Sequence, residues 1–112
     1  MNIQIFTRSK CFDSKKAERW FKERRIKFQQ IDLDQKGLSP RELDSVIAAV
    51  GLENLIDEKS KSPDAATMKY LSSNDQKREK LLDDPRLIKS PIVRNGRFAT
   101  VGYCPEVWEK WE

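Results

Sequence analysis

Histidine is absent from this 112-residue sequence, and cysteine occurs only twice, as Cys11 and Cys104. Without histidine, no Cys–His catalytic pair can form. A structural zinc site needs four ligands at characteristic Cys and His spacings, and two distant cysteines do not supply them. The composition therefore excludes a histidine-activated nucleophile, and we expect no metal site.

Long apolar runs are also absent. No stretch approaches the ~20 apolar residues that span a membrane, and the start of the chain does not have the pattern of a secretory signal. We therefore expect a soluble protein of the reducing cytoplasm without membrane contact, in which a lone disulfide would be transient. A chain of 112 residues is expected to form one domain.

Acidic residues are scarce near the N-terminus. Residues 1–27 hold nine Lys or Arg and three Asp or Glu, whereas residues 28–112 hold thirteen and fifteen. A basic face around Cys11 could attract an anion. The alternative is an ordinary solvated helix face, and direct binding of nucleic acid is not expected.

Cys11 stands between a strand-like run and a helical run. Residues 2–6 read as a short strand, and residues 14–25 read as an amphipathic helix whose N-cap is Ser14 or Asp13. Free backbone N–H groups and the helix dipole favour a thiolate at such a junction. The cations expected to add to this effect are Arg8, Lys10, Lys15 and Lys16. The pattern predicts a reactive thiol with a lowered pKa; the alternative is a buried cysteine that packs as a small hydrophobe.

The middle of the chain reads as one strand followed by helices. Residues 28–33 complete a β-α-β unit, for which a right-handed crossover and parallel strands are expected. Ser39, Pro40 and Glu42 form a capping box at the start of a helix that Gly51 ends. Short helices are expected at 65–71 and from Ser73 or Asn74 to about 82, so residues 38–83 read as a helical insert.

The last third predicts two antiparallel strands and a helix. A strand-like run over 87–93 contains Ser90-Pro91, where a cis peptide bond would account for the proline. Asn95-Gly96 is a strong hairpin signal leading to a return strand over 97–103. Arg94 and Arg97 are expected to be solvated. A helix over 105–112 brings Trp108 and Trp111 to the core.

This order of elements resembles the arsenate reductase-like family that includes ArsC and the regulator Spx. The matching pieces are Ile5-Phe6-Thr7, Ser14-Lys15-Lys16-Ala17, Ile31-Asp32-Leu33, Leu38-Ser39, Gly51 with Leu55-Ile56, Leu87 to Val93 and Gly102-Tyr103. The resemblance implies an α/β thioredoxin-like, glutaredoxin-type fold with a mixed four-stranded sheet and an inserted helical layer. It implies one ArsC-like domain over 1–112, with a frame of 1–37 and 84–112 around the insert 38–83.

The resemblance also implies that Cys11 is the nucleophile, and it indicates where the site departs from the family. The three arginines that hold arsenate in classical members correspond here to Lys59, Ser90 and Tyr103. These side chains do not reproduce the bidentate contact of arginine with an oxyanion, so arsenate reduction is not expected. The regulator Spx typically carries Cys-x-x-Cys, and Ser14 replaces its second cysteine.

The expected function is therefore thiol redox chemistry by one cysteine of a bacterial protein, without a bound cofactor. Glutathione is the expected co-substrate, and a thioredoxin- or glutaredoxin-type protein is an expected partner. Ser14 would donate a hydrogen bond to the thiolate, and Ser90 would offer its backbone to a thiol peptide beside Pro91. Lys59 is a further catalytic candidate, as electrostatic support for the thiolate or an anion. Lys10, Lys15 and Tyr103 are candidates for substrate binding, and Cys104 is a candidate resolving thiol.

Several alternatives remain open at this point, among them arsenate reduction with anion ligands other than arginine. Pro91 could serve only to shape its strand, and Cys104 could be an ordinary unpaired thiol. The protein could also be a non-catalytic, Spx-like binding module, in which case RNA polymerase is the expected partner.

Overall fold

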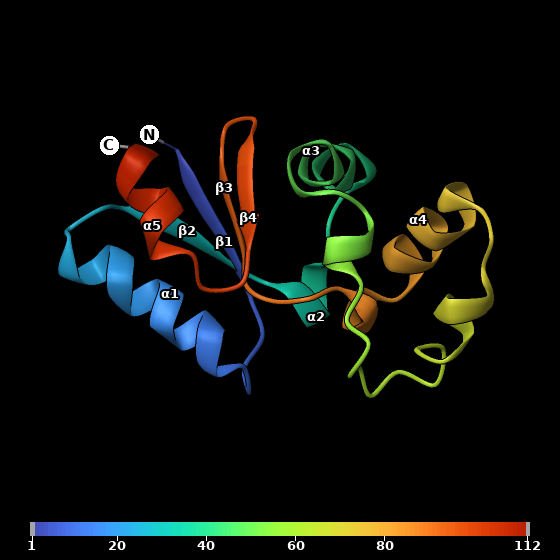
Figure 1. Cartoon of the computed structure of the whole chain (residues 1–112). Coiled ribbons are helices and arrows are strands. Elements are labelled where there is room, and N and C mark those ends of the chain that lie inside the picture. Colours follow the sequence, from blue (N-terminus) through green and yellow to red (C-terminus); the bar gives the residue numbers. More distant parts are fainter. Residues whose placement is uncertain (1, 112) are drawn as a thin grey trace.

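A four-stranded mixed sheet with the order β2-β1-β3-β4 organises the chain in a computed structural model that describes residues 2–111 (Figure 1). Strand β1 (Ile3–Thr7) is parallel to β2 (Phe28–Asp32) and antiparallel to β3 (Ile92–Asn95). Strand β4 (Phe98–Val101) continues the sheet antiparallel to β3. The predicted mixed four-stranded sheet is therefore confirmed.

Helices cover both faces of this sheet. Figure 1 shows α1 (Phe12–Glu23) and α5 (Pro105–Trp108) on one side and α3 (Pro40–Val50) on the other, with α4 (Asn74–Asp83) farther out. The one-turn helix α2 (Leu33–Lys36) follows β2 directly. Short 3-10 segments are η1 (Glu53–Leu55), η2 (Thr67–Tyr70), η3 (Pro85–Leu87) and η4 (Glu109–Trp111). Among residues 2–111, no helix has the length and apolar character needed to cross a membrane.

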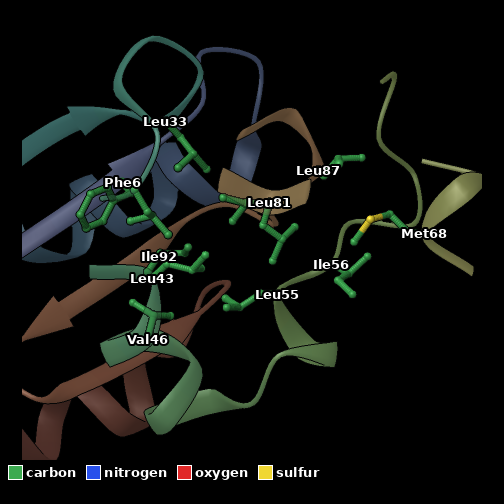
Figure 2. Close-up of a cluster of buried hydrophobic side chains, with 12 residues drawn as sticks. Phe6, Leu33, Leu43, Val46, Leu55, Ile56, Met68, Leu81, Leu87 and Ile92 are labelled. Atoms are coloured by element: carbon green, nitrogen blue, oxygen red, sulfur yellow. The ribbon is translucent and has the colours of Figure 1, made fainter. Parts of the chain in front are cut away.

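The alternation of side chains along β1 places a separate core on each face of the sheet. On one face, Ile3 and Ile5 pack in a cluster that also contains Ala17, Trp20, Phe21, Val93 and Trp108. On the other face, Phe6 lies with Leu43 and Val46 of α3 in a larger cluster that extends into the insert (Figure 2). Both faces of β1 are therefore buried, and Cys11 follows its carboxyl end.

Two local predictions are confirmed in atomic detail. The Ser39 hydroxyl accepts a hydrogen bond from the Glu42 N–H at 3.1 Å, and the Glu42 carboxylate accepts one from the Ser39 N–H at 2.9 Å. The β3–β4 hairpin turns at Asn95-Gly96, where Gly96 has φ +61°. Such a left-handed backbone favours glycine or asparagine.

Several predicted element boundaries are wrong. The second strand ends at Asp32, because the Asp32 carboxylate accepts hydrogen bonds from the Asp34 and Gln35 N–H groups and starts α2 at Leu33. The run 87–93 is not one strand: Leu87 belongs to η3, and β3 begins at Ile92. The expected helix 65–71 is the 3-10 segment η2, and the final helix becomes 3-10 after Trp108, while Glu112 lies outside the described residues.

The predicted cis peptide bond between Ser90 and Pro91 is confirmed. The expectation that Arg94 is solvated is wrong, because its side chain is only 16% exposed. Its guanidinium donates to the Gln4 side chain at 2.7 Å and lies 3.7 Å from the Glu42 carboxylate. Arg94 thus ties β3 to β1 and to the start of α3.

Candidate functional site

Cys11 is itself the N-cap of α1, so the prediction that Ser14 or Asp13 caps this helix is wrong. The Cys11 N–H donates to the Arg8 carbonyl at 3.1 Å, which closes the loop between β1 and α1. The Ser14 hydroxyl lies inside the first turn, where it accepts the Arg8 N–H at 3.2 Å. A buried interaction of Ser14 across the loop has replaced the expected capping bond, and the helix starts earlier, at Phe12.

Opposing effects act on the Cys11 thiol. Burial raises its pKa, but hydrogen bonds from the Ser14 and Ser90 hydroxyls and from the Ser14 and Asp13 N–H groups outweigh it and hold the pKa below the ordinary thiol value. In the protonated form, the thiol lies 3.6 Å from the Ser90 carbonyl oxygen, to which it donates. Donors aimed at sulfur favour the charged form. Hydrogen bonds, and not the charge of neighbouring lysines, are thus the source of the lowered pKa.

A groove of about 1060 Å³ opens beside Cys11. Its wall includes the predicted residues Lys10, Lys59, Ser90 and Cys104. The other cations along it are Arg8, Lys61, Arg86 and Lys89, and the acidic residues are Asp13, Asp34, Asp57 and Glu58. Both arginines have aspartate partners at 2.9 Å, Arg8 with Asp34 and Arg86 with Asp84. The lysines are therefore the cations of the groove that are available to a ligand.

Lys15, Pro91 and Tyr103 are not among the residues that line this groove. Lys15 is exposed on α1, and Pro91 is buried with its carbonyl accepting the Gly102 N–H at 2.8 Å. The Tyr103 ring packs edge-on against Trp108, with 5.6 Å between centroids, and the Lys16 ammonium lies 5.8 Å from it. The structure therefore gives Tyr103 a packing contact in place of the ligand contact implied by its position in the sequence.

Cys104 caps α5 as Cys11 caps α1. Its thiol donates to the Val101 carbonyl at 3.3 Å. Burial raises the pKa of the Cys104 thiol, and the negative charges of Glu106 and Asp13 raise it further. Both thiols are free, and they differ in character: the pKa of Cys11 is lowered and the pKa of Cys104 is raised.

Arg8 has a role that its sequence position does not reveal. Its guanidinium donates to the Ile88 and Pro85 carbonyls, both at 2.8 Å, as well as to Asp34 at 2.9 Å. The expectation that Arg8 supplies free positive charge to the thiol is therefore wrong, because Asp34 and the two carbonyls occupy the guanidinium. Arg8 instead fixes the segment that leads to Ser90 against the loop that holds Cys11.

Replacing Arg8 by lysine should lower the free energy of unfolding by about 1–3 kcal/mol, since an ammonium cannot reproduce the planar fork and leaves a carbonyl without its donor. Urea denaturation measures the loss. The Arg41→Lys variant, at an exposed position of α3, is the control and should change stability by less than about 0.5 kcal/mol. Equal stability of the Arg8→Lys variant and the wild type would contradict the role assigned to Arg8.

Two known bacterial proteins are similar to this chain in sequence. YusI of Bacillus subtilis (strain 168), described as an uncharacterized protein, is 26% identical over 115 residues, covering 98% of each chain. Global transcriptional regulator Spx 2 of Oceanobacillus iheyensis is 28% identical over 106 residues, covering 92% of this chain and 78% of that protein.

The fold comparison agrees with the sequence comparison. The crystal structure of an ArsC family related protein from Bacteroides fragilis has a TM-score of 0.87 at 22% identity, covering 100% of this chain and 98% of that chain. The α/β fold is thioredoxin-like, as expected from the sequence. A model of the ArsC family matches residues 6–111, nearly the whole length, and the chain therefore belongs to the ArsC family.

Proposed function

We propose that this protein is a thiol–disulfide oxidoreductase in which Cys11 forms a mixed disulfide with a small thiol. The observation that carries the proposal is the placement of the Cys11 sulfur at the start of α1, in an open groove, with hydroxyl and N–H donors directed at it. A lowered pKa at an accessible position is what a nucleophilic thiolate requires.

Glutathione is the proposed co-substrate, because its two carboxylates suit the lysines of the groove. Lys10, Lys59, Lys61 and Lys89 line the groove that opens beside Cys11. The Cys11 thiolate attacks one sulfur of oxidised glutathione; a bond forms between Cys11 and that sulfur, the original S–S bond breaks, and one glutathione leaves as a thiolate. A thioredoxin- or glutaredoxin-type protein would then return Cys11 to the thiol.

Arsenate is not the proposed substrate. The two arginines that line the groove are engaged by Asp34 and Asp84, and the positions related to the family's arginines hold Lys59, Ser90 and Tyr103. A lysine or a hydroxyl gives an oxyanion a single contact where arginine gives two. An arsenate assay with glutathione and glutaredoxin should therefore show no turnover.

Alkylation measured against pH tests the proposal. The Cys104→Ser variant reports on Cys11 alone, and the Cys11→Ser variant reports on Cys104 alone. Because the Cys11 pKa is lowered and the Cys104 pKa is raised, Cys11 should react at a lower pH, and oxidised glutathione should modify Cys11 in preference. If Cys11 titrates no lower than a free thiol and takes up no glutathione, the proposal is wrong.

A second candidate is a protein-binding module of the Spx type. Its support is the similarity to Global transcriptional regulator Spx 2 together with two aromatic side chains left in solvent. Phe12, next to Cys11, is 83% exposed, and Tyr70 in the insert is 85% exposed. Exposed aromatic side chains are typical contributors to protein interfaces.

Purified bacterial RNA polymerase is the direct probe for this second candidate. Binding that persists in Cys11→Ser but is lost in Phe12→Ser or Tyr70→Ser would support an interaction module independent of thiol chemistry. Equal, weak binding by all four proteins, including the wild type, would rule it out.

A further inference from the structure

The two cysteines of this chain meet at one groove, although 92 positions of sequence separate them. Each is the N-cap of a helix, Cys11 of α1 and Cys104 of α5. Both helices lie on the same side of the sheet (Figure 1). The fold thus brings both sulfurs to the same end of the sheet, where a disulfide substrate of the groove would meet both.

Each thiol has a main-chain acceptor at this end of the sheet. The Cys11 sulfur is 3.6 Å from the Ser90 carbonyl oxygen, and the Cys104 sulfur is 3.3 Å from the Val101 carbonyl oxygen. Ser90 leads into β3 and Val101 ends β4, where Ile92 is the partner of Val101. Adjacent strands lie about 4.8 Å apart. One sulfur is therefore hydrogen-bonded to the carbonyl of the residue two positions before β3, and the other to the carbonyl of the last residue of β4, at the same end of these paired strands.

A left-handed glycine precedes Cys104 in the chain. Gly102 has φ +86°, and no heavy atom lies within 4 Å of the position that a Cβ would take there. Only Tyr103 stands between this glycine and Cys104. A disulfide needs Cα atoms within about 7 Å, so an internal disulfide requires Cys104 and Cys11 to come this near to each other.

The charges around the thiols distinguish their roles. Asp13, two residues after Cys11, is among the groups that raise the pKa of Cys104, so the first turn of α1 lies close enough to act on Cys104. Because the pKa of Cys11 is lowered and that of Cys104 is raised, Cys11 is the better attacking thiol and Cys104 has the smaller thiolate fraction.

We propose that Cys104 resolves the mixed disulfide formed on Cys11 and produces an internal Cys11–Cys104 disulfide. This step rests on the proposed function, because it requires the glutathione adduct as its substrate. Cys104 loses its proton to solvent and attacks the Cys11 sulfur; the bond from Cys11 to glutathione breaks, and glutathione leaves as a thiolate. In total, one oxidised glutathione becomes two reduced glutathiones, and the protein dithiol becomes a disulfide.

The test follows the reduced full-length protein after addition of oxidised glutathione, by intact mass and peptide mapping. In the wild type, the adduct on Cys11 should be transient and give way to an internal disulfide. In the Cys104→Ser variant, the adduct should persist at least about tenfold longer, since an intramolecular thiol acts at an effective concentration of millimolar order. The Cys11→Ser variant should form no internal disulfide. Circular dichroism of each variant establishes that it is folded.

The outcomes separate this inference from the proposed function. An adduct as stable in the wild type as in Cys104→Ser would overturn the resolving role of Cys104 and leave the reactivity of Cys11 in place. A disulfide found only between two chains, and lost on dilution, would overturn it as well. Absence of any adduct on Cys11 in all the proteins would instead overturn the proposed function itself.

Discussion

Replacing Trp108 by alanine should lower the free energy of unfolding by about 3–5 kcal/mol. Trp108 is 1% exposed, and its indole lies between α1 and the sheet, with ring centroids 5.3 Å from Trp20 and 5.1 Å from Phe21. The indole N–H also donates to the Thr100 hydroxyl at 2.8 Å. Alanine would leave a cavity and an unpaired hydroxyl, and the loss is a large part of the 5–15 kcal/mol that typically stabilises a domain.

Chemical denaturation measures this loss, and Trp111→Ala is the matched control. Trp111 is the same residue type in the same C-terminal segment, but it is only partly buried against the cluster that contains Trp108. Its replacement should cost clearly less, because less apolar surface is removed from the interior. Equal losses at the two positions would contradict the assignment of Trp108 as the residue that closes this core.

Replacing Ser14 by alanine should raise the pKa of Cys11 and slow its alkylation at neutral pH by about three- to tenfold. Hydrogen bonds to charged groups are worth about 1.5–3 kcal/mol, so loss of the Ser14 hydroxyl would reduce the thiolate fraction by about ten- to hundredfold. The more basic thiolate is intrinsically more nucleophilic, with a Brønsted coefficient of about 0.4–0.5, and this offsets roughly half of the logarithm of the loss.

The pH dependence of alkylation shows whether the pKa of Cys11 rises in Ser14→Ala, whatever the size of the rate change. In the Ser14→Ala variant, the alkylation profile should move to higher pH, while the maximal rate at alkaline pH should not fall. Ser9→Ala is the control, because Ser9 also lines the groove but is not among the groups that shift the Cys11 pKa. A profile that stays in place in Ser14→Ala would show that Ser14 does not stabilise the thiolate.

Local chemistry made much of the fold predictable. The capping box at Ser39 and Glu42 and the Asn95-Gly96 hairpin depend on residues at most three positions apart, and both form as expected. The cis bond at Ser90-Pro91 is one of the explanations that the sequence offered for a proline within a strand-like run, and the structure contains it. The sequence predicts a second strand that ends one residue too late, at Leu33. Asp32 ends β2 because its side chain caps the next helix.

The geometry of the site could be predicted less well, because it depends on contacts between positions that lie far apart in the sequence. The helix was expected to start at Ser14, but the partner of its hydroxyl is the Arg8 N–H across a loop whose shape no periodicity reveals. The partners of Arg8 lie 77 and 80 positions away along the chain. Lys59 and Ser90 reach the groove with Cys11 as the family resemblance implied, whereas Tyr103 turns toward Trp108 because an aromatic ring gains more by packing there.

The hydrogen bonds of Arg8 also affect which substitutions this protein can tolerate near its groove. Two of its three partners are main-chain oxygens, at Pro85 and Ile88. Every amino acid supplies such an oxygen, so substitutions at these two positions leave the acceptors in place as long as the backbone keeps its path. On the Arg8 side the link depends on the Arg8 and Asp34 side chains. The exposed groove positions of the opposite segment, Arg86 and Lys89, can therefore change, and with them the ligand preference, without removing an acceptor of Arg8.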